Sequence, residues 1–376
     1  MDHQPLVSLI TVNYNGRAFL HGLLESLQAC RYPHLEIILV DNASADDSVA
    51  FVRSHYPQVQ IVENAQNYRF ARGNNIGMAR ARGSIVGLIN NDVVVDPDFL
   101  QPIVAAFAAD AELGAVQPKV LDLQRPGYLE YAGACGGFLD RLGYPFLRGR
   151  LFDRVEPDLG QYDTPLQVFW GSGAALFLRK QALEQVGGLD EAFELHMEEI
   201  DLCWRLHLAG WRIAVLPESR IWHYGGGTLA QHHPQKFYWN FRNNLFLLIK
   251  NLSANRLWRV LPLRIVLDGL ALLNELVRGK WRHAGFIARA YLWLLAHLPL
   301  LMARRAANRP WIARGAARTE ALLYPGSIVW EYFLRGRRRF ADLKYSQAFT
   351  RRLAYGRHLS PTQMEGVEQP YGTETV

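Results

Sequence analysis

Short apolar runs alternate with helical patterns along the first 120 residues. Each run is rich in Val, Ile and Leu and has the length of a buried strand. We expect four strands here, at residues 7–12, 35–40, 59–62 and 85–89. Between the first two strands, apolar residues recur at the spacing of one buried helix face, at Phe19, Leu20, Leu23, Leu24 and Leu27. This alternation predicts an α/β fold with a mostly parallel central sheet flanked by helices.

The pattern changes in the middle of the chain. Residues 121–165 are rich in glycine, proline and aromatic residues and have no clear period, so we expect loops and short strands. Regular elements then return, with strands expected at residues 168–178 and 211–216 and helices at about 180–186 and 198–210. Residues 221–223 are apolar or aromatic up to His223 and lie just beyond the last of these strands.

From residue 237 onwards the pattern is helical and amphipathic. Residues 261–277 and 284–303 are apolar, but each stretch contains ionisable side chains. Because a spanning helix needs about 20 nearly uncharged residues, we expect these helices to lie in the plane of a membrane. The sequence thus predicts a catalytic domain at residues 1–236 and a helical, membrane-associated region at residues 237–376.

Composition and charge narrow the class of protein. With 49% hydrophobic and 20% charged residues, a chain of 376 residues folds around a large core. The cysteines, Cys30, Cys135 and Cys203, are scattered, which argues against a disulfide framework or a zinc site and fits the cytoplasm. The net charge of +6 reflects arginines crowded into the last quarter, downstream of tryptophans and leucines. This favours an anionic membrane surface over nucleic acid, with a solvated helical face as the alternative.

Polar loops follow the predicted strands, and in an open α/β sheet such loops meet at the edge where ligands bind. We expect this edge to collect residues 13–16, 41–45, 67–75 and 91–93. Asp92 offers a hard oxygen ligand for Mg²⁺ or Mn²⁺ carrying a diphosphate, and an ordinary turn is the alternative. Tyr14 can stack on a nucleobase and Asp41 can accept its hydrogen bonds, although Asp41 after a strand is equally typical of an Asx turn.

Two further features of the chain suit a sugar nucleotide. Asn67, Arg72, Asn74 and Asn75 form a polar, cationic loop able to meet phosphate or ribose, unless they only begin a helix. Gly173 interrupts a predicted strand, where the missing side chain lets a ligand approach closely.

Acidic side chains cluster near the start of the predicted helix at residues 198–210. Glu198, Glu199 and Asp201 lie within four residues, and Asp201 can pair with Arg205 at the i,i+4 spacing. An acid-capped helix with one salt bridge is therefore one interpretation. The other is a carboxylate whose pKa is raised by its neighbours and which acts as general base on a sugar hydroxyl. His223 is a candidate to complete a metal shell or contact a leaving diphosphate.

Six segments spread in order over residues 6–230 closely resemble the family 2 glycosyltransferases, in particular the bacterial rhamnosyltransferase-like branch. The matching segments are residues 12–16, 40–44, 67–77, 88–93, 186–191 and 198–211. This resemblance implies the Rossmann-like GT-A fold, a nucleotide-diphospho-sugar donor, a divalent metal (Mg²⁺ or Mn²⁺) and inversion at the anomeric carbon. The C-terminal 140 residues lie outside the match.

The resemblance also implies roles for particular residues. Asp41 falls at the position of the nucleoside contact. Asp92 falls at the metal-binding acid of the family's DxD-type motif, which reads Asn90-Asn91-Asp92 in this chain. Glu199, next to Glu198, falls at the position of the catalytic base. Other contacts to the nucleotide-sugar are expected from Val12, Tyr14, Asn67, Arg72, Asn74 and Asn91, and a second metal ligand from His223. Support for the acceptor or the helix is expected from Gly173, Asp201, Trp204 and Arg205. The chain departs from the family at Arg69, where relatives typically have a glycine before the phenylalanine.

The resulting prediction is an inverting glycosyltransferase at the inner face of the cell membrane. It would move a sugar, such as the deoxyhexose rhamnose, to a hydroxyl of a glycan or lipid-linked acceptor, with no nucleic-acid partner. A sugar-nucleotide pyrophosphorylase is one alternative, but the loop at residues 13–17 has too few glycines for it. A non-catalytic, membrane-attached scaffold of the same fold is the other.

Overall fold

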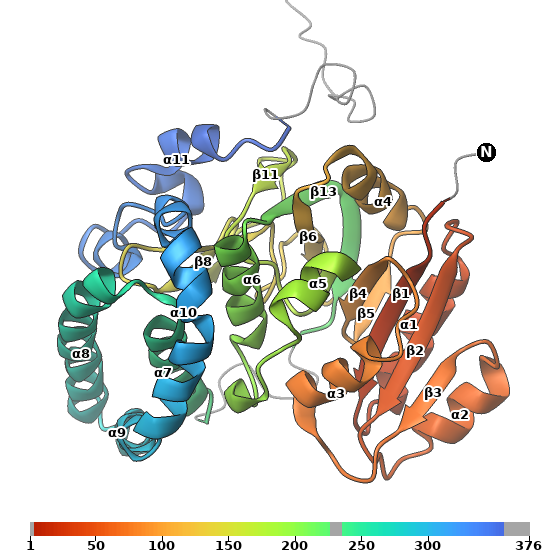
Figure 1. The fold of residues 1–376 in the computed structure, drawn as a ribbon, viewed down its shortest axis with the longest axis horizontal. Helices are drawn as coiled ribbons and strands as arrows, with labels where there is room; N and C mark the ends of the chain where they lie inside the picture. Colours follow the sequence, from red (N-terminus) through yellow and green to blue (C-terminus); the bar gives the residue numbers. More distant parts are fainter. Residues whose placement is uncertain (1–3, 226–234, 357–376) are drawn as a thin grey trace, which may run out of the picture.

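The computed structural model describes residues 4–225 and 235–356. Its first half is built on four parallel strands, β1 (Val7–Asn13), β2 (Leu35–Asp41), β3 (Gln60–Glu63) and β4 (Ile85–Ile89). They lie in the order β3-β2-β1-β4 and are connected by α1 (Arg17–Gln28), α2 (Ser48–His55) and α3 (Arg69–Met78) (Figure 1). Because β1 and β2 pair in register up to Asn13 and Asp41, both strands end at the same edge of the sheet.

The second half of the sheet is mixed. β12 (Ala175–Arg179) runs antiparallel between β4 and β6 (Leu113–Asp122), and β13 (Arg212–His223) runs parallel to β6. Two short strands, β5 (Val93–Val95) and β11 (Leu166–Gln167), pair antiparallel with β13, and α4 (Leu100–Ala109) connects β5 to β6. The predicted α/β fold with a mostly parallel central sheet is confirmed.

Two strands differ from the pattern that predicted them. The strand expected at residues 168–178 is regular only in β12, because the N–H groups of Val168 and Phe169 donate to Ile213 and Gly137 instead. The two segments expected at residues 211–216 and 221–223 form one strand, β13, whose register shifts between Leu216 and Arg220.

A second sheet fills the segment expected to hold loops and short strands. Its order is β10-β9-β8-β7, an antiparallel arrangement. The strands are β7 (Gly137–Leu139), β8 (Pro145–Leu147), β9 (Arg150–Leu151) and β10 (Arg154–Val155). The expected short strands are thus confirmed.

The helices near the predicted acidic cluster are confirmed as α5 (Lys180–Val186) and α6 (Glu198–Ala209), with the short η1 (Glu191–Phe193) between them. The C-terminal region forms α7 (Gln235–Asn251), α8 (Ala254–Val277), α9 (Trp281–Ala296), α10 (Leu298–Ala321), η2 (Trp330–Leu334), η3 (Phe340–Asp342) and α11 (Ser346–Arg352). In Figure 1 helices α7 to α10 gather on one side of the molecule, and α7 and α10 pack against α6.

None of the helices within residues 4–225 and 235–356 is by itself both long and apolar enough to cross a membrane. One bent pair, α9 followed by α10, reaches that length and composition together, with an angle of 69° between the two helices.

Candidate active site

The ends of β1, β2 and β4 meet in one hydrogen-bond network. Asn13 Nδ2 donates to Asp41 Oδ1 at 3.0 Å, and Asn91 Nδ2 donates to Asn13 Oδ1 at 2.9 Å. Gly16 lies against this network, since a Cβ built there would be 2.1 Å from Asn91 Nδ2. The structure therefore brings together three of the four predicted loops at one edge of the sheet.

Asp41 is buried at this edge and binds the turn after β2, although its contact is to the third residue and not to the second as in an Asx turn. Its Oδ1 accepts from Ser44 Oγ at 2.6 Å and its Oδ2 from the Ser44 N–H at 2.8 Å. Tyr14 lies in the same loop cluster with 47% of its surface exposed, available for stacking. Val12 is partly buried and packs under α3, where a Cβ at Gly73 would lie 2.9 Å from its Cγ1.

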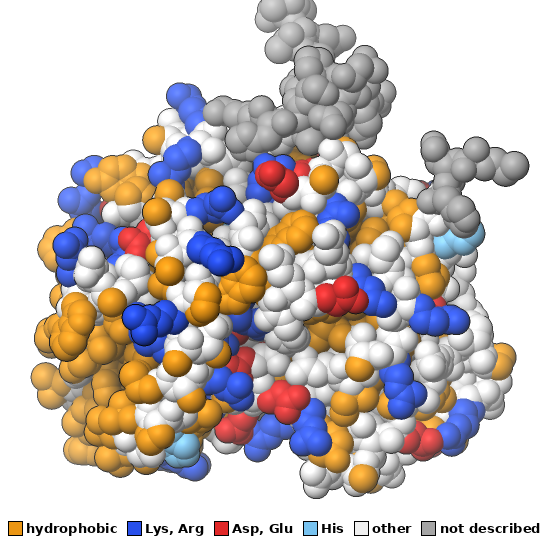
Figure 2. Space-filling model, in the orientation of Figure 1, with side chains coloured by type: hydrophobic (Ala, Val, Ile, Leu, Met, Phe, Trp, Pro, Cys, Tyr) orange, Lys and Arg blue, Asp and Glu red, His pale blue; other side chains and the backbone are white. Residues whose placement is uncertain are grey.

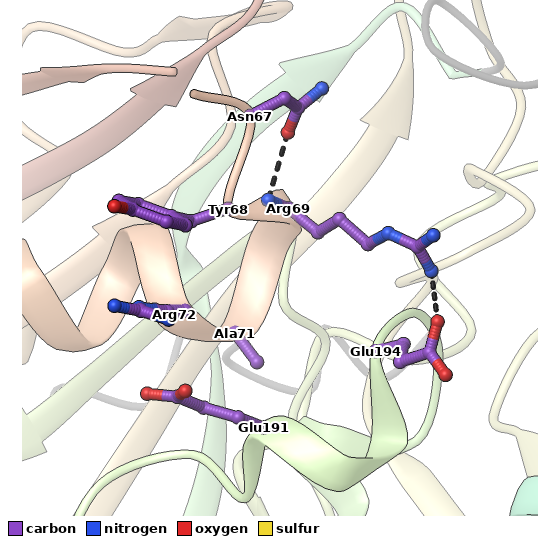
Figure 3. Close-up of a pocket in the computed structure, with 7 residues that line it drawn as sticks. All are labelled: Asn67, Tyr68, Arg69, Ala71, Arg72, Glu191 and Glu194. Carbon is purple, nitrogen blue, oxygen red and sulfur yellow. Dashed lines mark hydrogen bonds and ion pairs between the residues drawn. The ribbon is translucent and has the colours of Figure 1, made fainter. Parts of the chain in front are cut away.

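The fourth loop and the start of α3 line a cavity of about 200 Å³. Its lining residues are Asn67, Tyr68, Arg69, Ala71, Arg72, Glu191 and Glu194 (Figure 3). The Arg72 guanidinium lies 4.0 Å from the centre of the Tyr68 ring, and Arg69 forms an ion pair with Glu194 across the cavity. Asn67 Oδ1 accepts from the Arg69 N–H at 2.8 Å, so Asn67 also fixes the start of the helix.

Asn74 and Asn75 lie apart from this cavity. Asn74 is buried, and its Nδ2 donates to the Phe70 carbonyl one turn earlier in α3 at 3.0 Å. The side chain of Asn75 joins α3 to the segment before α6, since it donates to the Leu189 carbonyl and accepts from the Leu189 N–H, both at 2.9 Å. The structure thus gives both asparagines supporting contacts.

Asp92 and His223 form a buried acid–imidazole pair beside the Asn90-Asn91-Asp92 loop. His223 Nε2 lies 3.0 Å from Asp92 Oδ1 and 3.3 Å from Asn90 Nδ2. His223 Nδ1 lies 3.4 Å from Glu130 Oε1, at ion-pair distance but without hydrogen-bond geometry. Burial lowers the pKa of His223, but the hydrogen bond to Asp92 and the negative charges of Asp92 and Glu130 outweigh it and raise the pKa to about 10. Two buried carboxylates therefore favour a positive charge at this point.

The chemistry of this pair fits a divalent cation. A carboxylate oxygen is a ligand that Mg²⁺ and Mn²⁺ both accept. An imidazole nitrogen is a ligand for Mn²⁺ once the cation has displaced its proton. Among the described residues, no group of three or more His, Cys, Asp or Glu side chains is arranged to hold a metal ion. Because Mg²⁺ is usually held by one or two carboxylates together with substrate phosphates and water, a diphosphate ligand would supply the remaining contacts.

Glu198 and Glu199 begin α6 and differ in accessibility. Glu198 is buried, and its Oε2 has no hydrogen-bond partner in the described part of the chain. Burial, and after it the charge of Glu199, raises the pKa of Glu198 well above its usual range. Glu199 is only partly buried, and burial raises its pKa to about 7 against the opposing effect of backbone N–H groups at the helix start. A carboxyl whose pKa lies near neutral pH is suited to accept a proton, and the lower burial of the residue makes Glu199 a better candidate than Glu198.

Gly173 lies between this helix start and the Asn90-Asn91-Asp92 loop. A Cβ built at Gly173 would lie 4.0 Å from Glu199 Cβ and 3.1 Å from Phe70 Cζ. The next residue, Ala174, accepts at its carbonyl from the Asn90 N–H at 3.0 Å. The start of α6 and the loop that carries Asp92 therefore both contact the short segment before β12.

The loop that leads into α6 is strained and is held by α7. Three of its non-glycine residues have positive φ angles, Glu194 (61°), His196 (68°) and Met197 (70°). Asn243 is fully buried in α7, and its Nδ2 reaches three loop carbonyls, those of Phe193 (3.0 Å), Leu195 (2.7 Å) and His196 (2.8 Å). The neighbouring Arg242, also buried, donates to the Ala192 carbonyl. Such strain persists only where the surroundings fix it, and α7 provides that constraint directly before Glu199.

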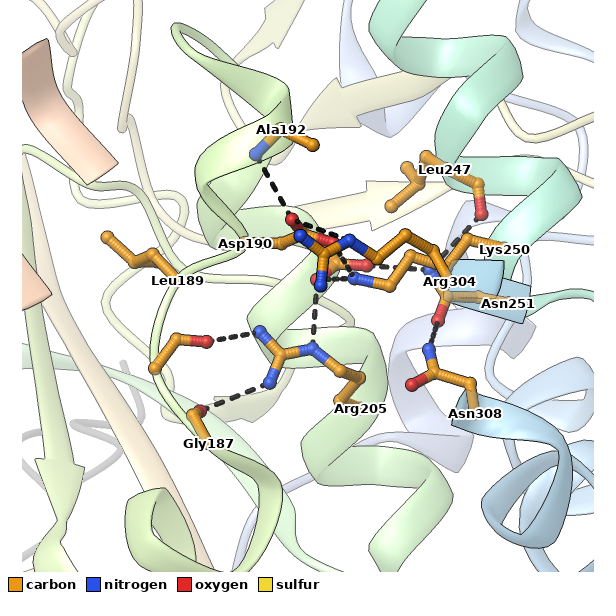
Figure 4. Close-up of polar contacts among 12 residues, drawn as sticks. Gly187, Leu189, Asp190, Ala192, Arg205, Leu247, Lys250, Asn251, Arg304 and Asn308 are labelled. Atoms are coloured by element: carbon orange, nitrogen blue, oxygen red, sulfur yellow. Dashed lines mark hydrogen bonds and ion pairs between the residues drawn. The ribbon is translucent and has the colours of Figure 1, made fainter. Parts of the chain in front are cut away.

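Asp201 anchors α6 to α7. Its Oδ2 accepts from Arg205 Nε and from Lys250 Nζ, each at 2.8 Å, and its Oδ1 accepts from Asn251 Nδ2 at 2.9 Å. Lys250 Nζ also reaches Asp190 Oδ2 at 2.6 Å (Figure 4). The predicted Asp201–Arg205 pair is thus present, within a buried network that supports the helix.

Trp204 is part of the core. It is almost fully buried and packs edge-on against Phe169, with ring centres 5.1 Å apart. It supports α6 through packing.

Several residues of the site carried no separate signal in the sequence. Glu130 lies in the segment without a period, and Arg242 and Asn243 lie in a helix whose polar residues resembled a solvated face. Asn13 and Ser44 lie inside the matching segments, so a hydrogen-bonding role beside Asp41 was detectable there.

Comparisons with family models and with known proteins point to glycosyltransferases. The family described as "Glycosyl transferase family 2" matches residues 8–129, and "Glycosyl transferase family group 2" matches residues 85–307, more than half of the chain. The chain is 26% identical over 312 residues to the N-acetylglucosaminyl-diphospho-decaprenol L-rhamnosyltransferase of Mycobacterium tuberculosis, covering 74% of this chain and 95% of that protein. It is 29% identical over 240 residues to the O-antigen biosynthesis protein RfbC of Myxococcus xanthus, covering 62% of this chain but only 18% of that protein.

Among the solved structures that share the fold are two bound to sugar nucleotides or their parts. A crystal structure of GalNAc-T7 with UDP, GalNAc and Mn²⁺ has a TM-score of 0.52 and 15% identity, covering 66% of this chain and 48% of that chain. A crystal structure of S. aureus TarS 1-349 in complex with UDP-GlcNAc has a TM-score of 0.50 and 17% identity, covering 88% of this chain and 92% of that chain. At these identities the likeness concerns the fold alone.

Proposed function

Because the chain belongs to glycosyl transferase family 2, we propose that it moves a sugar from a nucleotide-diphospho-sugar to a hydroxyl of a glycan or lipid-linked acceptor, with inversion at the anomeric carbon. The donor class is supported by similar structures that contain UDP with GalNAc, or UDP-GlcNAc. A deoxyhexose such as rhamnose is supported by the relative of which this chain covers 95%, a rhamnosyltransferase that acts on a decaprenol-linked sugar. Residues 1–236 would form the catalytic domain, and residues 237–376 would reach a lipid-linked acceptor at the inner face of the cell membrane.

The observation that carries the proposal is the position of Glu199. Burial raises the pKa of its carboxyl to about 7, and the residue as a whole is only partly buried. Its Cβ lies beside Gly173, whose neighbour Ala174 accepts a hydrogen bond from Asn90 in the loop that carries Asp92. Near neutral pH a substantial fraction of Glu199 is ionised, yet it remains basic enough to take a proton in the transition state. Burial and the charge of Glu199 raise the pKa of Glu198, which disfavours a second negative charge beside Glu199.

The reaction is a direct displacement. Glu199 takes the proton of the acceptor hydroxyl while the acceptor oxygen forms its bond to the anomeric carbon. The bond from that carbon to the diphosphate oxygen breaks on the opposite face, and the electron pair leaves with the nucleoside diphosphate. Tyr14 and the loop fixed by Asp41 would hold the nucleoside, and the loop of Asn67 and Arg72 would meet phosphate or ribose.

Asp92 and His223 would hold a divalent cation, Mg²⁺ or Mn²⁺. When bound, such a cation neutralises charge that develops on a departing diphosphate. The Asn13–Asn91 hydrogen bond ties this loop to the nucleoside loop, so the nucleoside and the diphosphate of the donor would be bound by one connected network.

A single substitution tests the proposal. Glu199→Gln removes the base without changing the size of the side chain, and transfer is expected to fall about 10²–10⁴-fold. Donor binding, followed by calorimetry, should stay unchanged because the donor loops are untouched. Glu184→Gln, on the exposed face of α5, is the matched control and should transfer normally. Turnover of Glu199→Gln within tenfold of the parent would remove Glu199 from this role.

A further inference from the structure

From residue 260 to its end, helix α8 has its charged residues inside and most of its large apolar residues outside. Between residues 260 and 277 it contains three charged side chains, Arg264, Asp268 and Glu275, and all three are buried. Soluble helices bury their apolar stripe and expose the charged one. The arrangement in α8 is the reverse.

The buried charges are paired inside the protein. The Arg264 guanidinium lies 3.7 Å from the centre of the Tyr144 ring, and its Nη1 donates to the Leu142 carbonyl at 3.1 Å. Asp268 Oδ2 accepts from the Tyr291 hydroxyl at 2.8 Å. Glu275 Oε2 lies 2.8 Å from His283 Nδ1. The polar face of α8 is thus bound to the loop between β7 and β8 and to α9, which fixes the apolar face outwards.

The outward surface is apolar over both α8 and α9. Trp258 and Val277 are each 80% exposed, and between them lie four more large apolar side chains at least 49% exposed: Ile265, Val266, Leu270 and Leu273. The surface continues at the start of α9 and along its outer side with Trp281, Leu292 and Leu295, exposed by 64% or more. Figure 2 shows hydrophobic side chains gathered over this side of the molecule. Exposed apolar surfaces of this extent mark sites of membrane or protein contact.

Cations lie at the ends of the surface. Arg259 is exposed near the start of α8, and Arg278, Lys280 and Arg282 are exposed between α8 and α9. A two-fold dimer through this face would set cations against cations, because both ends of the strip are positive. Anionic lipid headgroups around an apolar interior complement both features.

We propose that the outward face of α8 and α9 inserts into an anionic lipid surface, with both helices lying in its plane. The inference deepens the proposed function by naming the surface that meets the membrane of a lipid-linked acceptor, but its physical basis is independent of sugar transfer. In-plane insertion agrees with the finding that neither α8 nor α9 alone reaches the length and composition of a spanning helix.

The test is co-flotation of the full chain with vesicles of phosphatidylcholine, with or without phosphatidylglycerol. The parent chain should float with the anionic vesicles and bind neutral ones at least tenfold more weakly. The double variant Ile265→Asp/Leu270→Asp should bind anionic vesicles at least tenfold more weakly than the parent chain. Leu159→Asp is the control, because Leu159 is also 80% exposed but lies in the catalytic part, and this variant should float like the parent.

Two further readouts keep the outcomes distinct. Both positions of the double variant are exposed, so its melting temperature should match that of the parent, and its transfer to a soluble acceptor should be unchanged. A parent chain that ignores vesicles and elutes as a dimer, which the double variant dissociates, would identify the face as a self-interface and overturn the proposal. Equal flotation of the double variant and the parent would overturn it as well.

Discussion

Asn243→Ala is expected to weaken catalysis while leaving donor binding intact. One amide group supplies all the side-chain hydrogen bonds that Asn243 makes to the carbonyls of Phe193, Leu195 and His196. Since an amide NH₂ has two hydrogens, it makes about two good hydrogen bonds at once. At roughly 0.5–1.5 kcal/mol each, their loss is worth about 1–3 kcal/mol.

This loss falls on a loop that is already strained. Positive φ angles at Glu194, His196 and Met197 each cost on the order of 1–3 kcal/mol, so the loop has cause to relax once the constraint is removed. Relaxation would displace Glu199, two residues after Met197. A factor of ten in rate corresponds to about 1.36 kcal/mol of activation free energy. If the whole loss of about 1–3 kcal/mol of hydrogen-bond energy raises the barrier of the chemical step, kcat falls about 5- to 150-fold.

The assay compares kcat, donor affinity and the pH dependence of transfer. A relaxed loop admits water to Glu199, so the pKa seen on the acid side of the profile should move down from about 7. Asn255→Ala, an exposed asparagine at the start of α8, is the matched control. If Asn243→Ala lowers the melting temperature but leaves kcat within twofold and the pH profile in place, Asn243 supports the fold without positioning the base.

Three other outcomes are expected. Because burial raises the pKa of Glu199 to about 7 and the base must be ionised, kcat/KM should fall about tenfold per pH unit below pH 7. A flat profile from pH 5.5 to 8 in a stopped transfer assay would argue against Glu199 as the base. Asp92→Asn should weaken Mn²⁺-dependent donor binding by about 10–100-fold in calorimetry; an unchanged affinity would exclude Asp92 as a metal ligand. Lys250→Met leaves Asp190 and Asp201 buried without their shared cation, so denaturant unfolding should show a loss of about 3–5 kcal/mol, and a loss below 1 kcal/mol would contradict that account.

The fold and the sheet edge were predictable because they depend on local patterns. Asp41 and Asp92 each follow an apolar run, and parallel strands bring such ends together whatever the rest of the chain does. The sequence identified Glu198 and Glu199 as two candidate bases. Which of them is the better candidate depends on how exposed each residue is, and the sequence does not reveal that for two adjacent positions.

The remaining features depend on contacts between distant segments. Glu130 lies 93 positions before His223, and nothing in its own segment distinguishes it from a surface acid. Asn243 is a polar residue of the kind expected on a solvated helix face, yet it is fully buried. The charges within residues 261–277 argued correctly against a spanning helix, but only the fold shows that they point inwards and leave the apolar face exposed.

The C-terminal helices therefore serve the site and the proposed membrane surface together. Asn243 and Lys250 of α7 hold the loop and the helix that carry Glu199, while Arg264 and Asp268 turn the apolar face of α8 outwards from the same bundle. Deleting residues 237–376 would expose the carbonyls and carboxylates that α7 satisfies, and activity would be lost whether or not a membrane is involved. Substitutions on the outer face of α8 and α9 would separate lipid binding from base positioning, because the side chains on that face are exposed.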